Sequence, residues 1–207
     1  MLDFTFEREF QQKRQLNGLL AGLDEAGRGP IAGPVTAAAV ILDPDNLPAG
    51  LDDSKRLSAA QRERLAVEIR ERSLAWGVGW GCVGEIAREN IIGASFLAMR
   101  RALDRLTVEP VFLLVDGPAQ RLHFPRLRLP AIGIVKGDSK VASIAAASIL
   151  AKTARDEVMA RYDELLPGYG FAKNKGYGKP ALDALKRLGA TPIHRYSWSA
   201  VQQLELG

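Results

Sequence analysis

Short apolar runs bounded by glycine, proline and polar residues occupy the first part of the chain, a pattern typical of β-strands. Residues 19–24 and 35–42 form two such runs, joined by a loop rich in glycine and proline. Residues 74–82 alternate large side chains with mostly small ones, which indicates a half-buried strand whose tryptophans, Trp76 and Trp80, belong to the core. The pattern therefore predicts three early strands, of which the first two are hairpin-like neighbours.

Helical spacing of apolar positions predicts two helices in the same half of the chain. Ser58 and Gln61 form a capping-box signature for a helix that runs to about residue 72. Apolar residues recur at helical spacing between 91 and 106, which indicates a second, amphipathic helix. Residues 1–15 are polar and helix-prone, and we expect them to form a loosely attached leading helix.

The second half of the chain follows a similar alternation. Residues 111–115 and 131–135 are apolar on both faces, as in buried parallel strands. An alanine-rich helix is expected from about 139 to 165, with small residues that permit close packing on a sheet. The basic stretch 173–179 resembles a loop, and residues 181–188 predict a last short helix.

This order of elements predicts an α/β fold, with a mixed five-stranded sheet flanked by helices and a small C-terminal helical part. We expect one compact unit with three parts. They are a leading segment, 1–17, a central α/β domain, 18–166, and a C-terminal basic loop and helical part, 167–207.

Composition limits the class of protein. With 207 residues, of which 47% are apolar, the chain can form one globular domain with a substantial core. No apolar run approaches the roughly 18 residues of a membrane span, and the early acids Asp3, Glu7 and Glu9 do not resemble a signal peptide. The single cysteine, Cys82, excludes an internal disulfide framework and a cysteine-based metal cluster. We therefore expect a soluble cytoplasmic protein.

Charge is distributed unevenly along the chain. Residues 1–120 contain 14 Lys/Arg and 17 Asp/Glu, a net charge of −3, whereas residues 121–207 contain 14 and 7, a net charge of +7. An acidic pocket beside a basic surface is typical of proteins that bind polyanions. Charge alone does not separate this interpretation from a merely solubilising basic face.

Four acids occupy positions where strands are predicted to end. Asp24 and Glu25 lie side by side at the end of the first strand, Asp116 ends a later strand, and Asp138 follows the next one. Functional groups collect beyond the C-terminal ends of parallel strands, so these acids are expected to share one crevice. Asp116 alone could be a turn residue, and Asp138 could be a helix N-cap.

Clustered carboxylates require a counter-charge. Two carboxylates about 4 Å apart repel by roughly 4 kcal/mol at an effective dielectric constant of about 20. Because only oxygen ligands are available, the expected ion is hard, Mg²⁺ or Mn²⁺. A pair of such ions can activate a water molecule and stabilise the leaving oxygen in phosphodiester cleavage.

The glycine-rich loop 27–32 also fits a dinucleotide-binding fingerprint, G-x-G-x-x-A, after a strand. That motif requires a helix to begin at the loop, whereas residues 35–42 predict a strand. The two preceding acids would also repel a pyrophosphate. A nicotinamide-dependent oxidoreductase is therefore excluded, and the exposed backbone of the loop fits close approach to a sugar–phosphate chain.

Seven motifs occur in the order found in bacterial ribonuclease HII, and the chain resembles that family over about residues 19–200. The motifs are Asp24-Glu25-Ala26-Gly27-Arg28-Gly29-Pro30, Asp53-Ser54-Lys55, Val115-Asp116-Gly117, Lys136-Gly137-Asp138, Ala145-Ala146-Ala147-Ser148-Ile149-Leu150-Ala151-Lys152, Lys175-Gly176-Tyr177 and His194-Arg195.

The resemblance implies a ribonuclease H-like fold in which residues 18–166 form the catalytic domain. Asp24, Glu25, Asp116 and Asp138 would be the catalytic tetrad. The first three of these would be the principal metal ligands.

The resemblance also implies roles in substrate recognition. Gly27, Arg28 and Gly29 would read the 2′-hydroxyl of the ribonucleotide, the group that distinguishes RNA from DNA. Tyr177 would stack on the deoxyribose of the following nucleotide and so sense an RNA-to-DNA junction.

Four lysines, Lys55, Lys152, Lys173 and Lys175, would contact phosphates, which gives position and affinity rather than sequence choice. Each could equally be a solvated surface residue.

The remaining features of the C-terminal part suggest structural roles. His123 and His194 are not needed as ligands, and His194-Arg195 is expected to be structural or to lie near phosphate. Trp198 stands where the family more often has phenylalanine, which we interpret as a packing change. No aromatic pair near Gly207 resembles a sliding-clamp peptide.

The implied function is that of a monomeric endoribonuclease acting on RNA–DNA hybrids and on single ribonucleotides in duplex DNA. Cleavage by two metal ions, Mg²⁺ or Mn²⁺, would leave a 3′-hydroxyl and a 5′-phosphate, with roles in ribonucleotide and RNA-primer removal. Two alternatives are a ribonuclease HIII-like nuclease and a non-catalytic nucleic-acid-binding domain. Arg28 between the glycines, aspartate at Asp138 and the absence of an N-terminal extension favour HII.

Overall fold

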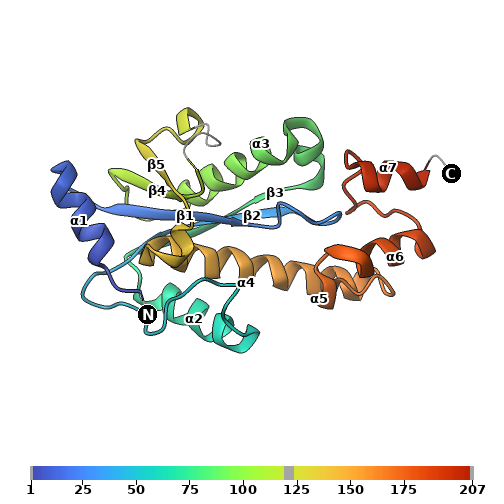
Figure 1. Cartoon of the computed structure of the whole chain (residues 1–207), viewed down its shortest axis with the longest axis horizontal. Coiled ribbons are helices and arrows are strands. Elements are labelled where there is room, and N and C mark those ends of the chain that lie inside the picture. Colours follow the sequence, from blue (N-terminus) through green and yellow to red (C-terminus); the bar gives the residue numbers. More distant parts are fainter. Residues whose placement is uncertain (1, 119–123, 206–207) are drawn as a thin grey trace.

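A computed structural model describes residues 2–118 and 124–205 of the chain (Figure 1). The strands are β1 (Leu20–Ala26), β2 (Val35–Ile41), β3 (Ala75–Gly81), β4 (Phe112–Asp116) and β5 (Ala131–Ile134). The α-helices are α1 (Thr5–Arg14), α2 (Ala59–Arg72), α3 (Val83–Leu103), α4 (Ala142–Leu165), α5 (Phe171–Asn174), α6 (Gly178–Leu188) and α7 (Ser199–Glu205), and two 3₁₀ turns are η2 (Phe124–Leu127) and η3 (Gly137–Ser139). Within the described ranges, no helix has both the length and the apolar composition to cross a bilayer.

The five strands form one mixed sheet in the order β3-β2-β1-β4-β5. β2 pairs antiparallel with both β1 and β3, whereas β4 pairs parallel with β1 and β5. The predicted mixed five-stranded α/β architecture is therefore confirmed. The C-terminal ends of β1, β4 and β5 meet at one edge of the sheet because these three strands are parallel.

Helices cover both faces of the sheet (Figure 1). One face of β1 and β2, including Leu23 and Ala37, packs on α3, and the opposite face packs on α4 and α2. α4 comes very close to β1, since a Cβ atom added at Gly22 would lie 2.2 Å from the carbonyl carbon of Ser143. The alanine-rich sequence of α4 therefore places this helix directly against the strand that carries the first acids.

The two tryptophans of β3 are not core residues, which corrects the sequence-based expectation. Trp76 is 37% exposed and Trp80 is partly buried, whereas the intervening glycines face α3. A Cβ atom added at Gly79 would lie 2.0 Å from the carbonyl oxygen of Ala98. Because the backbones of β3 and α3 approach so closely, the glycine face is the one covered, and the tryptophans project from the other side of an edge strand.

The leading helix α1 is firmly docked, so the prediction of loose attachment is wrong. Phe6 and Phe10 pack against a buried cluster that includes Phe112. The side chain of Glu7 is fully buried, and its Oε1 accepts a hydrogen bond of 2.8 Å from the backbone N–H of Ser143 in the first turn of α4. The polar composition of α1 did not indicate that it packs on the domain, because one of its acids, Glu7, is buried and binds the N-terminal turn of α4.

Helix boundaries agree with the sequence pattern except in α3 and the C-terminal part. The capping box of Ser58 and Gln61 is present at the start of α2. α3 begins earlier than predicted and bends at Asn90, whose φ is 57°, and the Oδ1 of Asn90 accepts hydrogen bonds from the N–H groups of Ile92 and Gly93 at 2.9 and 3.1 Å. The short helices α5 and α7 were not predicted, because neither is long enough to show a periodic pattern.

Replacement of Gly79 by alanine is expected to lower the free energy of unfolding by about 3 kcal/mol, the upper end of typical overpacking costs. The added methyl group would meet the backbone of α3, which cannot move as a flexible side chain can. Gly84→Ala is the matched control, because the nearest atom to its added Cβ is the Cys82 sulfur at 4.0 Å. Chemical denaturation should show a clear loss for the first variant and none for the second; equal stability of the two would contradict the close packing of β3 on α3.

Candidate active site

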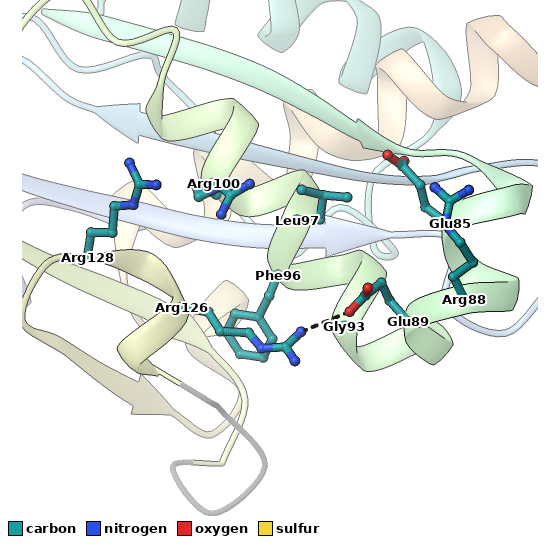
Figure 2. Close-up of a pocket in the computed structure, with 9 residues that line it drawn as sticks. All are labelled: Glu85, Arg88, Glu89, Gly93, Phe96, Leu97, Arg100, Arg126 and Arg128. Atoms are coloured by element: carbon teal, nitrogen blue, oxygen red, sulfur yellow. Dashed lines mark ion pairs between the residues drawn. The ribbon is translucent and has the colours of Figure 1, made fainter.

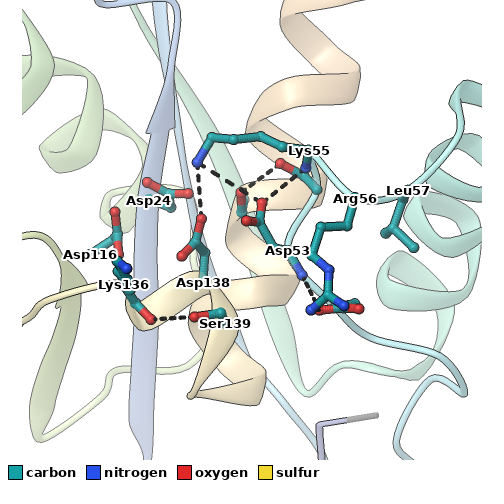
Figure 3. A network of polar contacts seen from close by, with 12 residues as sticks. Asp24, Asp53, Lys55, Arg56, Leu57, Asp116, Lys136, Asp138 and Ser139 are labelled. Carbon is teal, nitrogen blue, oxygen red and sulfur yellow. Dashed lines mark hydrogen bonds and ion pairs between the residues drawn. The ribbon is translucent and has the colours of Figure 1, made fainter.

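Four acids gather at the C-terminal edge of the parallel strands. Asp24 and Glu25 lie at the end of β1, Asp116 is the last residue of β4, and Asp138 lies in η3 after β5. Leu23 of β1 pairs with Val115 of the parallel strand β4. The residues that follow them, Asp24 and Asp116, therefore direct their side chains to the same side of the sheet. Figure 3 shows Asp24, Asp116 and Asp138 beside one another, with Lys55 reaching toward them.

Asp24, Glu25 and Asp116 border a cavity of about 470 Å³ that is also lined by most of the predicted recognition residues. Its lining includes Asp24, Glu25, Gly27, Arg28, Gly29, Lys55, Asp116, Lys152 and Tyr177. Asp138 lies next to this cavity rather than on its lining, and it contacts Lys55. The structure thus brings together residues that lie more than 150 positions apart in the sequence.

Burial and mutual repulsion disfavour ionisation of the acids. Burial raises the pKa of Asp24 well above its usual range, and the neighbouring charges of Glu25 and Asp116 raise it further. Burial also raises the pKa of Asp116, with a contribution from the charge of Asp138. The pKa of Glu25 is raised by burial even though the guanidinium of Arg28, 3.0 Å away, opposes this effect. Ionising all of these acids would therefore place negative charge here that the protein itself does not fully compensate.

Lys55 supplies part of the missing positive charge. Its Nζ donates a hydrogen bond of 3.1 Å to Oδ2 of Asp138 and lies 3.9 Å from Oδ1 of Asp53. Burial alone would lower the pKa of Lys55, but the hydrogen bond and charge of Asp138 outweigh this and raise it. Asp138 does not cap α4, whose N-cap is Val141 and has no side-chain cap, so the N-cap alternative for Asp138 is excluded.

The donor set fits a hard divalent cation. All the acidic groups at this edge offer carboxylate oxygens, the ligands that Mg²⁺ and Mn²⁺ prefer. In the part of the chain that the structure describes, no three His, Cys, Asp or Glu side chains form a ready-made ligand set. The raised pKa values of Asp24, Glu25 and Asp116 nevertheless indicate that an added cation would be stabilised here.

A second cavity of about 420 Å³, between α3 and the segment around Arg126, has the opposite electrostatics (Figure 2). Its two acids are each compensated by an arginine: Glu85 lies 2.7 Å from Arg101, and Glu89 lies 3.6 Å from Arg126. The hydrogen bonds from Arg101 lower the pKa of Glu85 to about 2. Neutralised acids do not attract a metal ion, so the cavity that contains Asp24 is the candidate active site.

The predicted phosphate-binding lysines differ in their surroundings. The Lys152 ammonium lies 2.6 Å from Oδ1 of Asp156, and the Lys175 ammonium donates to the backbone oxygen of Asp156 at 3.3 Å. Lys173 borders a neighbouring cavity rather than the one that contains the acids. The side chain of Lys55 is 77% exposed and directed at the acids.

His194 has a structural place, and His123 lies outside the described residues. The His194 ring is buried against Tyr169 and Phe171, and its Nδ1 accepts a hydrogen bond of 3.0 Å from the N–H of Thr191.

Sequence reasoning did not assign several residues that shape this site. The hydroxyl groups of Ser54 and Ser148 lie 2.9 Å apart, and a hydrogen bond from Ser148 to Asp24 partly offsets the rise in the pKa of that acid. Arg155 and Arg195 are buried beneath the glycine loop. Serines in motifs and an arginine one turn after Lys152 were visible in the sequence, but nothing there indicated that they are buried.

Comparison with known proteins places the chain in a family. A family profile described as ribonuclease HII matches residues 21–201. The chain belongs to the ribonuclease HII family. Ribonuclease HII from Rhizorhabdus wittichii is 56% identical over 188 residues, covering 90% of this chain and 91% of that protein, and the one from Moorella thermoacetica is 52% identical over 196 residues, covering 94% and 92%.

Solved structures show the same fold. Ribonuclease H2 of Pyrococcus horikoshii has a TM-score of 0.75 and 26% identity, covering 91% of this chain and 97% of that one. The ribonuclease HII of Archaeoglobus fulgidus, solved in complex with PCNA, has a TM-score of 0.72 and 28% identity, covering 87% and 95%. A Bst-RNase HIII structure with Mn²⁺ has a TM-score of 0.67 but only 22% identity, covering 91% and 69%, and shows the fold alone.

Membership in the ribonuclease HII family establishes the general activity. The protein is a hydrolytic endoribonuclease of the ribonuclease H type, which acts on RNA–DNA hybrids. The ribonuclease H-like fold implied by the sequence motifs is confirmed. Relatives of more than 50% identity bear the HII name, which decides against the HIII alternative.

Asp24→Asn is expected to stabilise the metal-free protein at pH 8. Because the pKa of Asp24 is raised in the folded state, the folded chain binds more protons than the unfolded one above the ordinary carboxyl pKa of about 3.9, and the free energy of unfolding falls as pH rises. Each kcal/mol gained raises the melting temperature by about 2–4 °C.

Melting curves in EDTA should therefore show a difference between wild type and Asp24→Asn that is largest at pH 8 and smallest at pH 4. Asp45→Asn, which changes an exposed acid, should stay within about 0.5 kcal/mol of wild type at every pH. A destabilised Asp24→Asn at pH 8 would show that the carboxylate is not under electrostatic strain.

Proposed function

We propose that this protein hydrolyses the phosphodiester bond on the 5′ side of a ribonucleotide, leaving a 3′-hydroxyl and a 5′-phosphate. Its substrates are continuous RNA strands in hybrids and single ribonucleotides in duplex DNA, so it would serve in removing ribonucleotides and RNA primers from DNA. The observation that supports this proposal is one cavity shared by incompletely compensated acids, by the Gly27–Gly29 loop and by Tyr177.

Asp24, Glu25 and Asp116 would hold the divalent cation, Mg²⁺ or Mn²⁺, because they are the acids on the cavity lining. When bound, paired cations supply an activated water molecule and stabilise the leaving oxygen. Asp138, next to the cavity, would position one of the ions or the attacking water. The Mn²⁺ complex of the Bst-RNase HIII supports a divalent cation on this fold.

The Gly27–Gly29 loop is suited to recognition of the ribose. Gly27 has a φ of +93°, and a Cβ atom there would lie 2.0 Å from Nε of Arg155, so the loop requires glycine at this position. A Cβ atom at Gly29 would lie 3.5 Å from the ring of Tyr177. The loop backbone and the tyrosine thus form adjacent walls, one for the 2′-hydroxyl and one for the next sugar.

The basic side chains around the cavity fit phosphate contacts. Lys55 and Lys152 line it, and Lys175 lies on the same side of α4 through its contact with Asp156. We propose that these three lysines bind the backbone of the duplex and set affinity rather than the choice of cleavage site. The cluster of acids on the same cavity agrees with the catalytic activity of the family and not with a merely nucleic-acid-binding role.

Asp24→Asn should lower kcat/KM on a continuous hybrid by a factor of roughly 10³ or more, since a metal ligand contributes several kcal/mol to transition-state stabilisation. Binding of the hybrid, measured by fluorescence anisotropy, should remain within about threefold of wild type because the lysines are untouched. Mg²⁺ should raise the melting temperature of the wild type more than that of the variant. Near-normal turnover by Asp24→Asn would refute its assignment, and Asp45→Asn provides the control.

Tyr177→Ala should reduce incision at a single ribonucleotide in duplex DNA more than cleavage of a continuous hybrid. Only the first substrate always presents a deoxyribose after the ribonucleotide, so only there is stacking on the sugar obligatory. The ratio of the two kcat/KM values should fall by about tenfold, the value of a lost stacking contact. Equal losses on both substrates would count against junction sensing, and Tyr196→Ala, at another exposed tyrosine, is the control.

A further inference from the structure

Two arginines are buried directly behind the recognition loop. Arg155, on α4, and Arg195, before α7, are both 0% exposed and are the two largest fully buried side chains among the described residues. No ion pair joins either to a carboxylate in the part of the chain that the structure describes. A buried charge without a counter-charge is costly, so the neutral groups around these guanidinium groups must compensate it.

Arg195 binds the backbone of the glycine loop. Its Nη2 donates to the carbonyl oxygen of Gly27 at 2.6 Å, its Nη1 to that of Arg28 at 2.9 Å and its Nε to that of Gly33 at 3.0 Å. One rigid guanidinium group therefore binds three carbonyl groups within residues 27–33. Two of these carbonyl groups belong to the residues proposed to read the 2′-hydroxyl.

Arg155 joins the glycine loop to the segment that carries Tyr177. Its Nε donates to the carbonyl oxygen of Pro34 at 3.1 Å, and its Nη2 donates to those of Ala32 at 3.2 Å and Lys175 at 3.1 Å. The Cζ atom of Arg155 also lies 5.3 Å from the centroid of the Tyr177 ring, a cation–π distance. Arg155 thus contacts both the glycine loop and Tyr177, the two walls of the cavity.

Backbone hydrogen bonds complete this unit. The N–H of Ile31 donates to the oxygen of Gly176 at 2.9 Å, and the N–H of Arg195 donates to the oxygen of Ile31 at 2.8 Å. All six carbonyl groups held by the two arginines lie in residues 27–34 or at Lys175. The side-chain hydrogen bonds of both arginines are therefore concentrated on the two segments that border the cavity.

We propose that Arg155 and Arg195 are positioning residues for substrate recognition. Arg195 fixes the ribose-sensing loop, and Arg155 sets Tyr177 relative to that loop and so determines the preference for a single ribonucleotide over a continuous hybrid. This inference rests on the proposed function, since it assumes that the loop and the tyrosine recognise substrate. Arg155 borders the cavity beside Tyr177, whereas Arg195 is not on the cavity lining, and the hydrogen bonds of both arginines go to backbone carbonyl groups. A side chain that holds several carbonyl groups in fixed geometry can change the rate through small displacements of what it holds.

Lysine substitutions separate charge from geometry, because an ammonium keeps the charge but cannot offer the planar fork of donors. Arg155→Lys should lower the ratio of kcat/KM for a single ribonucleotide to that for a continuous hybrid by about tenfold. Arg195→Lys should lower kcat on both substrates by roughly 10–100-fold with little change in KM, the size expected for a slightly misplaced recognition group.

Arg101→Lys is the matched control. Arg101 also donates to a carbonyl oxygen, that of Trp80 at 2.6 Å, and to an acid, but it belongs to the α3 side of the sheet. Its replacement should lower the melting temperature and leave the substrate ratio and kcat unchanged. If folded, stable Arg155→Lys and Arg195→Lys variants behave like Arg101→Lys, the inference is overturned.

A double-mutant cycle tests whether Arg155 acts through Tyr177, and it remains informative if Arg195→Lys does not fold. In the background of Tyr177→Ala, Arg155→Lys should cause no further fall in the substrate ratio, whereas additive losses would overturn the inference. If Tyr177→Ala alone leaves the ratio unchanged, junction sensing itself fails. If Tyr177→Ala lowers the ratio and Arg155→Lys does not, only the positioning role fails.

Discussion

The parallel pairing of β1 with β4 is the constraint on which the site depends. It places Asp24 and Asp116 on the same side of the sheet, where their charges and burial disfavour ionisation. Such an arrangement lowers the stability of the empty protein, and it persists because the surrounding sheet and helices fix both strands. A bound cation would relieve the same repulsion, so a cost in folding would favour the cation binding that we propose for this site.

Close packing of backbones makes that frame rigid. β1 meets α4 at Gly22, and β3 meets α3 along a row of glycines, so helices and strands approach without intervening side chains. α4 then presents Ser148, Lys152 and Arg155 toward the cavity from successive turns of one helix. The first turn of α4 is supported by α1, since the N–H of Ser143 donates to Glu7, so the leading helix also helps to hold α4 against the sheet.

The acids and the residues proposed for recognition are supported in different ways. The acids stand on strand ends, whereas the glycine loop and Tyr177 belong to irregular segments that have no ladder of their own. Buried guanidinium groups replace such a ladder by binding carbonyl oxygens in both segments. These hydrogen bonds hold two irregular segments in place beside the strand ends that carry the acids.

The sequence by itself determined the strand pattern, the capping box of α2, the mixed sheet and, through its motifs, the family. Those features depend on local periodicity or on residues adjacent along the chain. Only the tertiary structure decided that Trp76 lies outside the core, that α1 is docked and that Arg155 and Arg195 are buried. Each of these depends on which face of an element is covered, and this is set by backbone approach and by partners distant in sequence rather than by the residue's own polarity.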